Sequence, residues 1–380
     1  MVDARLVGDR FPGFVYGDAP RNVYWEITIA CDLACRHCRA NAIHDRDQAE
    51  LDTTEGRALL DDVRSMGSML ILTGGDPMKR PDLFELIDYG RGIGIPISIT
   101  PSTTPLLTRD AIARFRELGV AALGVSLDGP NADVHDAFRG VPGTFDQALA
   151  VLGWAREVGL PVQVNTTITS RTLQHLPALY RLLAESAVPP VRRWSLFLLV
   201  PTGRGADLGI PSAEEVERLF EWVFETAAGA AFHVGTIEAP HYRRYWIERK
   251  LAEGMPPAAL PAAAKRMGFG ARDGNGVVFV SHRGEVYPAG FLPYPLLGNV
   301  RERRLSDIYR DAPALRRLRD MNTLGGKCGR CDYRWACGGS RARAYAMTGD
   351  PMASDPFCAY VPVATGEPGQ ALERIPLAHS

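Results

Sequence analysis

Alternating strand and helix patterns between residues 24 and 200 constrain the fold more than any other feature of this chain. The strand patterns are short apolar runs suited to burial on both faces of a sheet. They cover residues 24–30, 69–72, 96–100, 121–127, 162–168 and 194–200. The helix patterns cover residues 52–67, 81–92, 108–118, 145–158 and 173–185. Strand–helix units repeated in this way predict a parallel sheet with its helices on the outside.

The first turn distinguishes two ways of building such a sheet. A dinucleotide-binding sheet needs a G-x-G-x-x-G run after its first strand, and residues 31–50 contain no glycine. We therefore expect an α/β chain with a partial (β/α)6 barrel of the TIM type, followed by a smaller α+β unit. Asp52 with Glu55, and Ser212 with Glu215, have the spacing of capping boxes and predict two helix starts.

The pattern breaks at residues 201–205, and four segments are predicted. They are an N-terminal extension (1–22), the barrel (23–230), a bridging segment (231–269) and a C-terminal unit (270–380). Within the bridging segment, residues 251–264 are rich in Ala and Pro and predict a flexible connection or lid. The C-terminal unit opens with a β-hairpin pattern over residues 277–280 and 284–287.

Charge and hydropathy argue against two classes of partner. The 380 residues include 43 Lys and Arg against 44 Asp and Glu, a net charge of -1. Such a chain has no net positive charge to attract nucleic acid or an anionic membrane. The first residues, MVDARLVGDRF, are charged where a secretory signal needs an apolar core, and no apolar run approaches the ~20 residues that span a bilayer. We expect a cytoplasmic protein that binds neither nucleic acid nor membrane.

The seven cysteines fall into two sets. The first is Cys31, Cys35 and Cys38, and the second is Cys328, Cys331, Cys337 and Cys358. An odd number of cysteines without a secretory signal favours metal binding over disulfides. Three thiolates on one loop can ligate three irons of a [4Fe–4S] cluster and leave the fourth iron open. Zinc is the alternative for the first set, with His37 or His44 as a fourth ligand.

The spacing C-x3-C-x2-C after the first strand resembles the signature of the radical S-adenosylmethionine (SAM) superfamily. The run Thr73-Gly-Gly-Asp-Pro77 resembles the G-G-E-P motif of that family, which binds the ammonium group of SAM, with Asp in place of the usual Glu. The resemblance implies a [4Fe–4S] cluster on the first cysteine set and SAM on its open iron. It also implies a set of SAM-binding positions around the strand ends. They are His37, Gly74, Gly75, Asp76, Ser102, Ser126, Arg139 and Asn165.

The second set has the spacing C-x2-C-x5-C with a distant fourth cysteine, which suits either a zinc ribbon or a complete [4Fe–4S] cluster. Beside a radical SAM domain it resembles the SPASM domain, which implies an auxiliary [4Fe–4S] cluster. The full SPASM pattern has two further cysteines, which Ala289 and Arg341 replace here, so we expect two clusters per chain. Residues 337–358 resemble the branch that includes the alternative haem synthase and the haem d1 side-chain enzyme.

This resemblance implies an oxidoreductase or lyase that reductively cleaves SAM to a 5′-deoxyadenosyl radical. The radical would take hydrogen from a small carboxylate-bearing metabolite, for decarboxylation or dehydrogenation in cofactor or natural-product biosynthesis. Arg204, Glu238 and His241 are the expected catalytic residues, and a flavodoxin or ferredoxin is the expected electron donor. The sequence carries no signal for an oligomeric state. Two alternatives are a SPASM maturase acting on a ribosomal peptide and a non-catalytic protein that binds zinc or nucleic acid.

Overall fold

A single ten-stranded sheet organises the molecule, which the computed structural model describes over residues 15–185 and 191–362. The strands lie in the order β10-β9-β8-β1-β2-β3-β4-β5-β6-β7, and every pairing from β1 to β7 is parallel. Their bounds are β1 Asn22–Glu26, β2 Met69–Thr73, β3 Ile97–Ile99, β4 Ala122–Ser126, β5 Val162–Ile168, β6 Val191–Leu198 and β7 His233–Ile237. The predicted α/β fold with a curved parallel sheet is confirmed.

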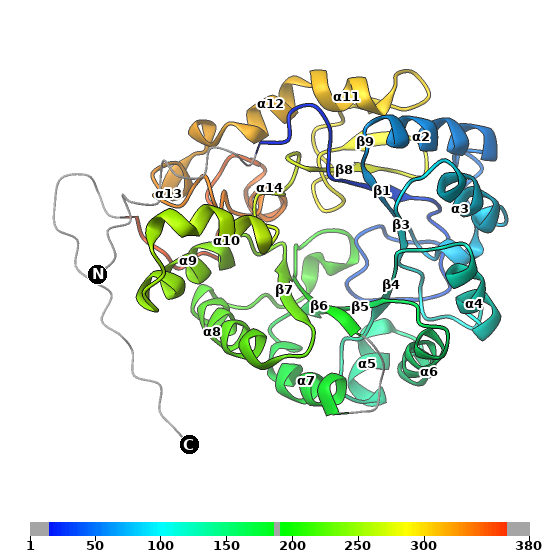
Figure 1. Cartoon of the computed structure of the whole chain (residues 1–380), viewed down its shortest axis with the longest axis horizontal. Coiled ribbons are helices and arrows are strands. Elements are labelled where there is room, and N and C mark those ends of the chain that lie inside the picture. Colours follow the sequence, from blue (N-terminus) through cyan, green and yellow to red (C-terminus); the bar gives the residue numbers. More distant parts are fainter. Residues whose placement is uncertain (1–14, 186–190, 363–380) are drawn as a thin grey trace.

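Helices cover the outer side of the curved sheet, and the loop after β1 lies inside it (Figure 1). Their bounds are α2 Thr53–Ser65, α3 Leu83–Gly92, α4 Arg109–Glu117, α5 Ala132–Arg139, α6 Thr144–Glu157, α7 Leu176–Glu185 and α8 Ala213–Gly229. Both predicted capping boxes are present, at Asp52 before α2 and at Ser212 before α8. None of the helices in the described residues is long and apolar enough to cross a membrane.

Alternation along β6 separates the core from the inner face of the sheet. Trp194 is fully buried, and its ring lies 6.0 Å from Trp222 of α8 and 6.4 Å from Tyr180 of α7. Because successive side chains of a strand point to opposite faces, Arg193 and Ser195 point to the inner face. The outer face therefore forms the apolar core with the helices, while the inner face carries polar side chains that a ligand can meet.

The C-terminal segment extends the same sheet. Strand β8 (Val277–Val280) pairs in parallel with β1, and β9 (Glu285–Tyr287) and β10 (Gly298–Asn299) continue antiparallel, which confirms the predicted hairpin. The helices that follow are α11 Leu305–Asp311, α12 Pro313–Arg319, α13 Gly326–Gly329 and α14 Arg341–Thr348. The division of the sequence at residue 270 stays a prediction.

The bridging segment is largely helical, and the expectation of a flexible connection or lid at residues 251–264 stays a prediction. Helix α9 spans Tyr242–Ala252, a 3₁₀ turn spans Pro257–Ala259, and α10 spans Leu260–Arg266. Leu260 and Ala264 are buried against the core. Alanine is the best helix former, and proline is tolerated in the first helical turn, so this composition suits short helices.

Candidate active site

The first cysteine loop begins directly after β1, at the carboxyl end of the parallel strands. Cys31 and Cys35 are buried, whereas Cys38 is half-buried. The Sγ of Cys31 lies 3.4 Å from Ser102 Oγ and accepts a hydrogen bond from Leu33 N, while that of Cys35 accepts one from Arg139 Nη1 at 3.7 Å. Three cysteine thiols with N–H donors around their sulfurs fit an iron–sulfur cluster, whose properties depend on such hydrogen bonds.

Arg204 holds this loop in place. Its Nε donates to the carbonyl oxygen of Cys35 at 2.9 Å, and its Nη1 donates to that of Ala42 at 3.3 Å. Its backbone N–H also donates to the carbonyl oxygen of Cys38 at 3.0 Å. The guanidinium therefore orients the carbonyl groups of the cysteine loop, and the catalytic role expected for Arg204 stays a prediction.

Gly74 and Gly75 let the turn after β2 pack against the chain that leaves β1. A Cβ on Gly74 would lie 2.4 Å from Thr28 O, and one on Gly75 would lie 2.3 Å from Ala30 O. The N–H groups of Gly75 and Asp76 donate to the same two carbonyl oxygens, at 2.8 and 2.6 Å. Only glycine permits this approach, so the motif and the cysteine loop are joined backbone to backbone.

Asp76 is fully buried beneath this turn. Its carboxylate accepts hydrogen bonds from Met78 N at 3.1 Å, Ser102 N at 3.2 Å and Thr104 Oγ1 at 2.8 Å. Burial raises the pKa of Asp76, although these donors act in the opposite direction. The carboxylate therefore ties the end of β2 to the loop after β3, in addition to any contact it makes with SAM.

We expect Asp76→Ala to weaken SAM binding and also to lower the free energy of unfolding by about 1–3 kcal/mol, because buried donors lose their acceptor. Calorimetric titration with SAM and thermal unfolding of the anaerobically reconstituted protein measure the two effects. Asp88→Ala is the control, because Asp88 is exposed on α3. Wild-type SAM affinity in Asp76→Ala would exclude the motif from the SAM site.

Ser126 and Asn165 face each other in register on β4 and β5, as expected of two contacts to one ligand. Both are half-buried on the inner face, and Asn165 Oδ1 accepts a hydrogen bond from Gln163 Nε2 at 2.8 Å. Ser102 lies in the loop after β3, beside Cys31. The structure thus brings these three predicted SAM contacts to the carboxyl half of neighbouring strands.

His37 and Arg139 are already engaged by protein groups. The His37 ring stacks on Phe138, with 4.4 Å between centroids, and burial together with the Arg139 charge lowers the pKa of His37 to about 3. Arg139 forms a buried ion pair with Asp128, which also accepts a hydrogen bond from Thr167 N. Asp128 lies in the Ser126–Gly129 turn and is a site residue that the sequence pattern did not predict. SAM contacts from His37 and Arg139 stay predictions.

The second cysteine set lines one pocket. All four cysteines of this set line the pocket, together with His241, Arg244 and Lys327. Backbone N–H groups of Tyr333, Gly339 and Asp355 donate to the Sγ atoms of Cys331, Cys337 and Cys328 at 3.3–3.4 Å. Burial raises the pKa of Cys331 to about 12 and that of Cys337 well above its usual value. Thiolates become stable in such a pocket when a metal centre supplies positive charge, so the donors fit a four-cysteine centre.

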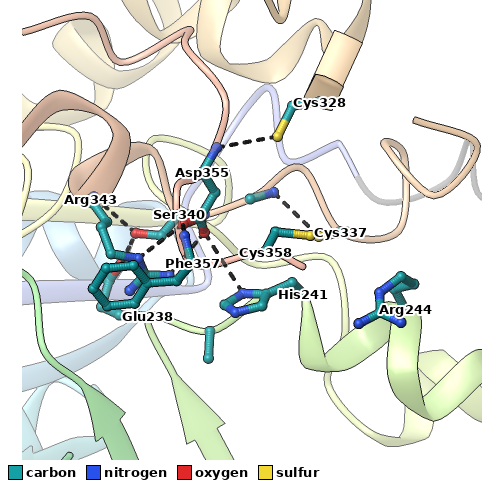
Figure 2. Close-up of polar contacts among 12 residues, drawn as sticks. Glu238, His241, Arg244, Cys328, Cys337, Ser340, Arg343, Asp355, Phe357 and Cys358 are labelled. Carbon is teal, nitrogen blue, oxygen red and sulfur yellow. Dashed lines mark hydrogen bonds and ion pairs between the residues drawn. The ribbon is translucent and has the colours of Figure 1, made fainter. Parts of the chain in front are cut away.

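Glu238 and His241 belong to a group of side chains near Cys328, Cys337 and Cys358 (Figure 2). Glu238 directly follows β7 with a φ of 55°, and its Oε2 accepts a hydrogen bond from Ser340 Oγ at 2.7 Å. His241 is fully buried, and its Nδ1 lies 3.7 Å from Asp355 Oδ2. Arg343 donates twice to the Asp355 carboxylate, at 2.9 Å each. These residues form one network that excludes Arg204, so the three expected catalytic residues do not converge.

Comparison with known proteins assigns this geometry to a family. Residues 25–183 match the Radical SAM superfamily. The chain is 40% identical over 347 residues to the "AdoMet-dependent heme synthase" of Oleidesulfovibrio alaskensis, covering 90% of this chain and 88% of that protein. It is 34% identical over 351 residues to the "Fe-coproporphyrin III synthase" of Methanosarcina barkeri, covering 88% and 87%. The chain belongs to the radical SAM superfamily.

Membership makes the chain a radical SAM enzyme and implies a [4Fe–4S] cluster and SAM. It argues against the non-catalytic zinc or nucleic-acid-binding alternative. Among solved structures, SAM-bound SuiB of Streptococcus suis superposes with a TM-score of 0.71 at 18% identity, covering 90% of this chain and 78% of that one. At this identity the likeness shows the fold alone, and it agrees with the α/β architecture described above.

Proposed function

We propose that this enzyme is a haem synthase, which converts propionate side chains of an iron porphyrin into vinyl groups. The observation that carries the proposal is the end-to-end similarity to a protein named AdoMet-dependent heme synthase. Haem differs from Fe-coproporphyrin III, the product named for another relative, in that vinyl groups replace some of the propionates. Fe-coproporphyrin III is therefore the proposed substrate, and it belongs to the expected class of small carboxylate-bearing metabolites.

The proposed reaction sets what the protein must provide. Each conversion removes one hydrogen atom from the carbon β to the carboxylate, releases carbon dioxide and one electron, and leaves a carbon–carbon double bond. When bound, SAM on the first cluster supplies the radical that takes the hydrogen atom, and a second cluster supplies a one-electron acceptor. The protein must hold both centres, orient the propionate and exclude water.

We assign the two cysteine sets as the ligands of the two clusters. Cys31, Cys35 and Cys38 would bind the first cluster, and the loop contacts of Arg204 keep their backbone in place. The second set would bind a closed cluster, for which the convergence of its four cysteines on one pocket is the support. A flavodoxin or ferredoxin is the proposed source of the reducing electron.

Burial raises the pKa of Glu238 to about 8, so this side chain is largely a neutral acid at pH 7. A neutral acid at the end of β7 does not repel an anionic substrate, and it can donate a hydrogen bond to one. His241 lines the pocket of the second cysteine set, so we propose that it lies beside the second cluster.

Anaerobically reconstituted protein, supplied with dithionite, SAM and Fe-coproporphyrin III, is expected to form haem and 5′-deoxyadenosine, both quantified by liquid chromatography with mass spectrometry. A reaction without SAM is the control. Deoxyadenosine release with an unchanged porphyrin would contradict the proposal. Modification of a peptide in place of the porphyrin would favour the maturase alternative.

A further inference from the structure

We propose that Arg193, assisted by Tyr24, binds a carboxylate of the substrate on the inner face of the curved sheet. The inference rests on the proposed function, because it assigns the residues that hold a propionate for reaction.

Arg193 lies on the third position of β6 and points inward, opposite to the buried Trp194. Its Nε donates to Ser195 Oγ at 2.9 Å, so the side chain runs along the strand toward the carboxyl end. A Cβ built on Gly235 of the neighbouring β7 would lie 3.2 Å from Arg193 Nη2. The guanidinium therefore lies beside Gly235, in a space that it shares with the imidazole of His233, whose Cε1 would lie 2.7 Å from that Cβ.

The charge of this guanidinium is not neutralised within the part of the chain that the structure describes. No Asp or Glu of residues 15–185 and 191–362 forms an ion pair with Arg193, and its Nη atoms have no hydrogen-bond partner there. Burial lowers the pKa of Arg193, yet an arginine stays charged in a protein. Arg193 is half-buried, and a bound carboxylate would supply the missing counter-charge by pairing with its free Nη donors.

Tyr24 of β1 also points to the inner face of the curved sheet. Its neighbour Trp25 packs outward against Gly56 and Arg80, so Tyr24 faces inward. Burial raises the pKa of Tyr24, the charge of Arg193 lowers it, and the charge of Glu238 adds to the rise. Burial keeps the pKa of Tyr24 above its usual value, so the phenol retains its proton and can donate to the same carboxylate.

The site lies level with the predicted SAM contacts. Ser126, Asn165, Ser195 and Gly235 are partners in register across β4, β5, β6 and β7. The Arg193 guanidinium reaches this row through its contacts with Ser195 and Gly235. A propionate held there would present its carbon chain to a SAM molecule bound by Ser126 and Asn165, and hydrogen-atom transfer requires such proximity.

The test compares Arg193→Gln, Arg193→Lys and Arg192→Gln in the reconstituted full-length protein. Arg192→Gln is the matched control, because Arg192 is exposed on the same strand. Arg193→Gln should bind Fe-coproporphyrin III about 10- to 100-fold more weakly, measured by the porphyrin absorption shift, because a charge-assisted pair is lost. Arg193→Lys should recover part of the loss. Iron content, SAM affinity and thermal unfolding should match the wild type in all three variants.

Each contrary result has a distinct meaning. If the wild type binds no porphyrin and forms no haem, the proposed function fails and this inference fails with it. If the wild type does both and Arg193→Gln matches it, only the inference is overturned. If Arg193→Gln instead loses SAM affinity and keeps porphyrin affinity, the guanidinium pairs with the carboxylate of SAM, which also overturns the inference.

Discussion

Replacing Cys31, Cys35 and Cys38 together by alanine is expected to abolish SAM cleavage while leaving about four irons per chain, compared with about eight in the wild type. The reason is that the first loop alone offers three thiols and an open coordination position, whereas the second set lines a separate pocket near the C-terminal helices. Iron assay, visible absorption and chromatography of 5′-deoxyadenosine measure the two effects on one preparation.

Arg36→Ala is the matched control, because Arg36 is an exposed residue of the same loop. It should keep both the iron and the activity. Residual SAM cleavage in the triple variant would show that the first loop does not hold the centre that reduces SAM. Loss of all iron would show that the two sites do not load independently, and twelve irons in the wild type would imply a third cluster with ligands other than cysteine.

The second large effect is expected from Cys328→Ala combined with Cys331→Ala. This variant should keep the first cluster and release 5′-deoxyadenosine, yet form almost no haem, because the electron left on the substrate has no acceptor. The pocket also loses two of its four metal ligands, and metal binding is coupled to folding in such ligand-rich segments. We therefore expect lower solubility as well as lower product yield, both measured beside the wild type.

Arg330→Ala controls for a change in the same short segment, since Arg330 is exposed between the two cysteines. Haem formation at the wild-type rate in the double-cysteine variant would make the second centre dispensable for turnover. In that case its role would be confined to the stability of the C-terminal segment.

Much of the fold is local in the sequence and could be predicted from it. The capping boxes at Asp52 and Ser212 fix two helix starts, and the apolar run of β5 was predicted at residues 162–168, where the strand lies. These features depend on neighbours within a few residues. The spacing of each cysteine set is equally local, which is why the family resemblance could be stated from the sequence and was then confirmed.

The rest depends on contacts between distant residues. Nothing in the local pattern shows that Asp128 pairs with Arg139, or that Asp355 accepts from Arg343 and lies beside His241. The inward direction of Arg193 follows from alternation with Trp194, but its place beside Gly235 of β7 depends on how the strands pair. The helices in the Ala- and Pro-rich stretch at residues 251–264 were not predicted, because helix propensity and turn signals compete there and burial of Leu260 is not visible in the local pattern.

The pairing of β8 with β1 also sets an order of events during protein synthesis. Asn22 of β1 pairs with Val277 of β8, a partner made about 250 residues later. At the usual elongation rate of ~5–20 residues per second, β1 waits roughly 10 to 50 s for that neighbour. Throughout this interval the emerging barrel has an unpaired strand edge next to its first cysteine loop, and such edges promote association with other chains. The pairing that protects this edge is also one of the most distant in the chain, so closure of the sheet is expected to be a late and slow step of folding.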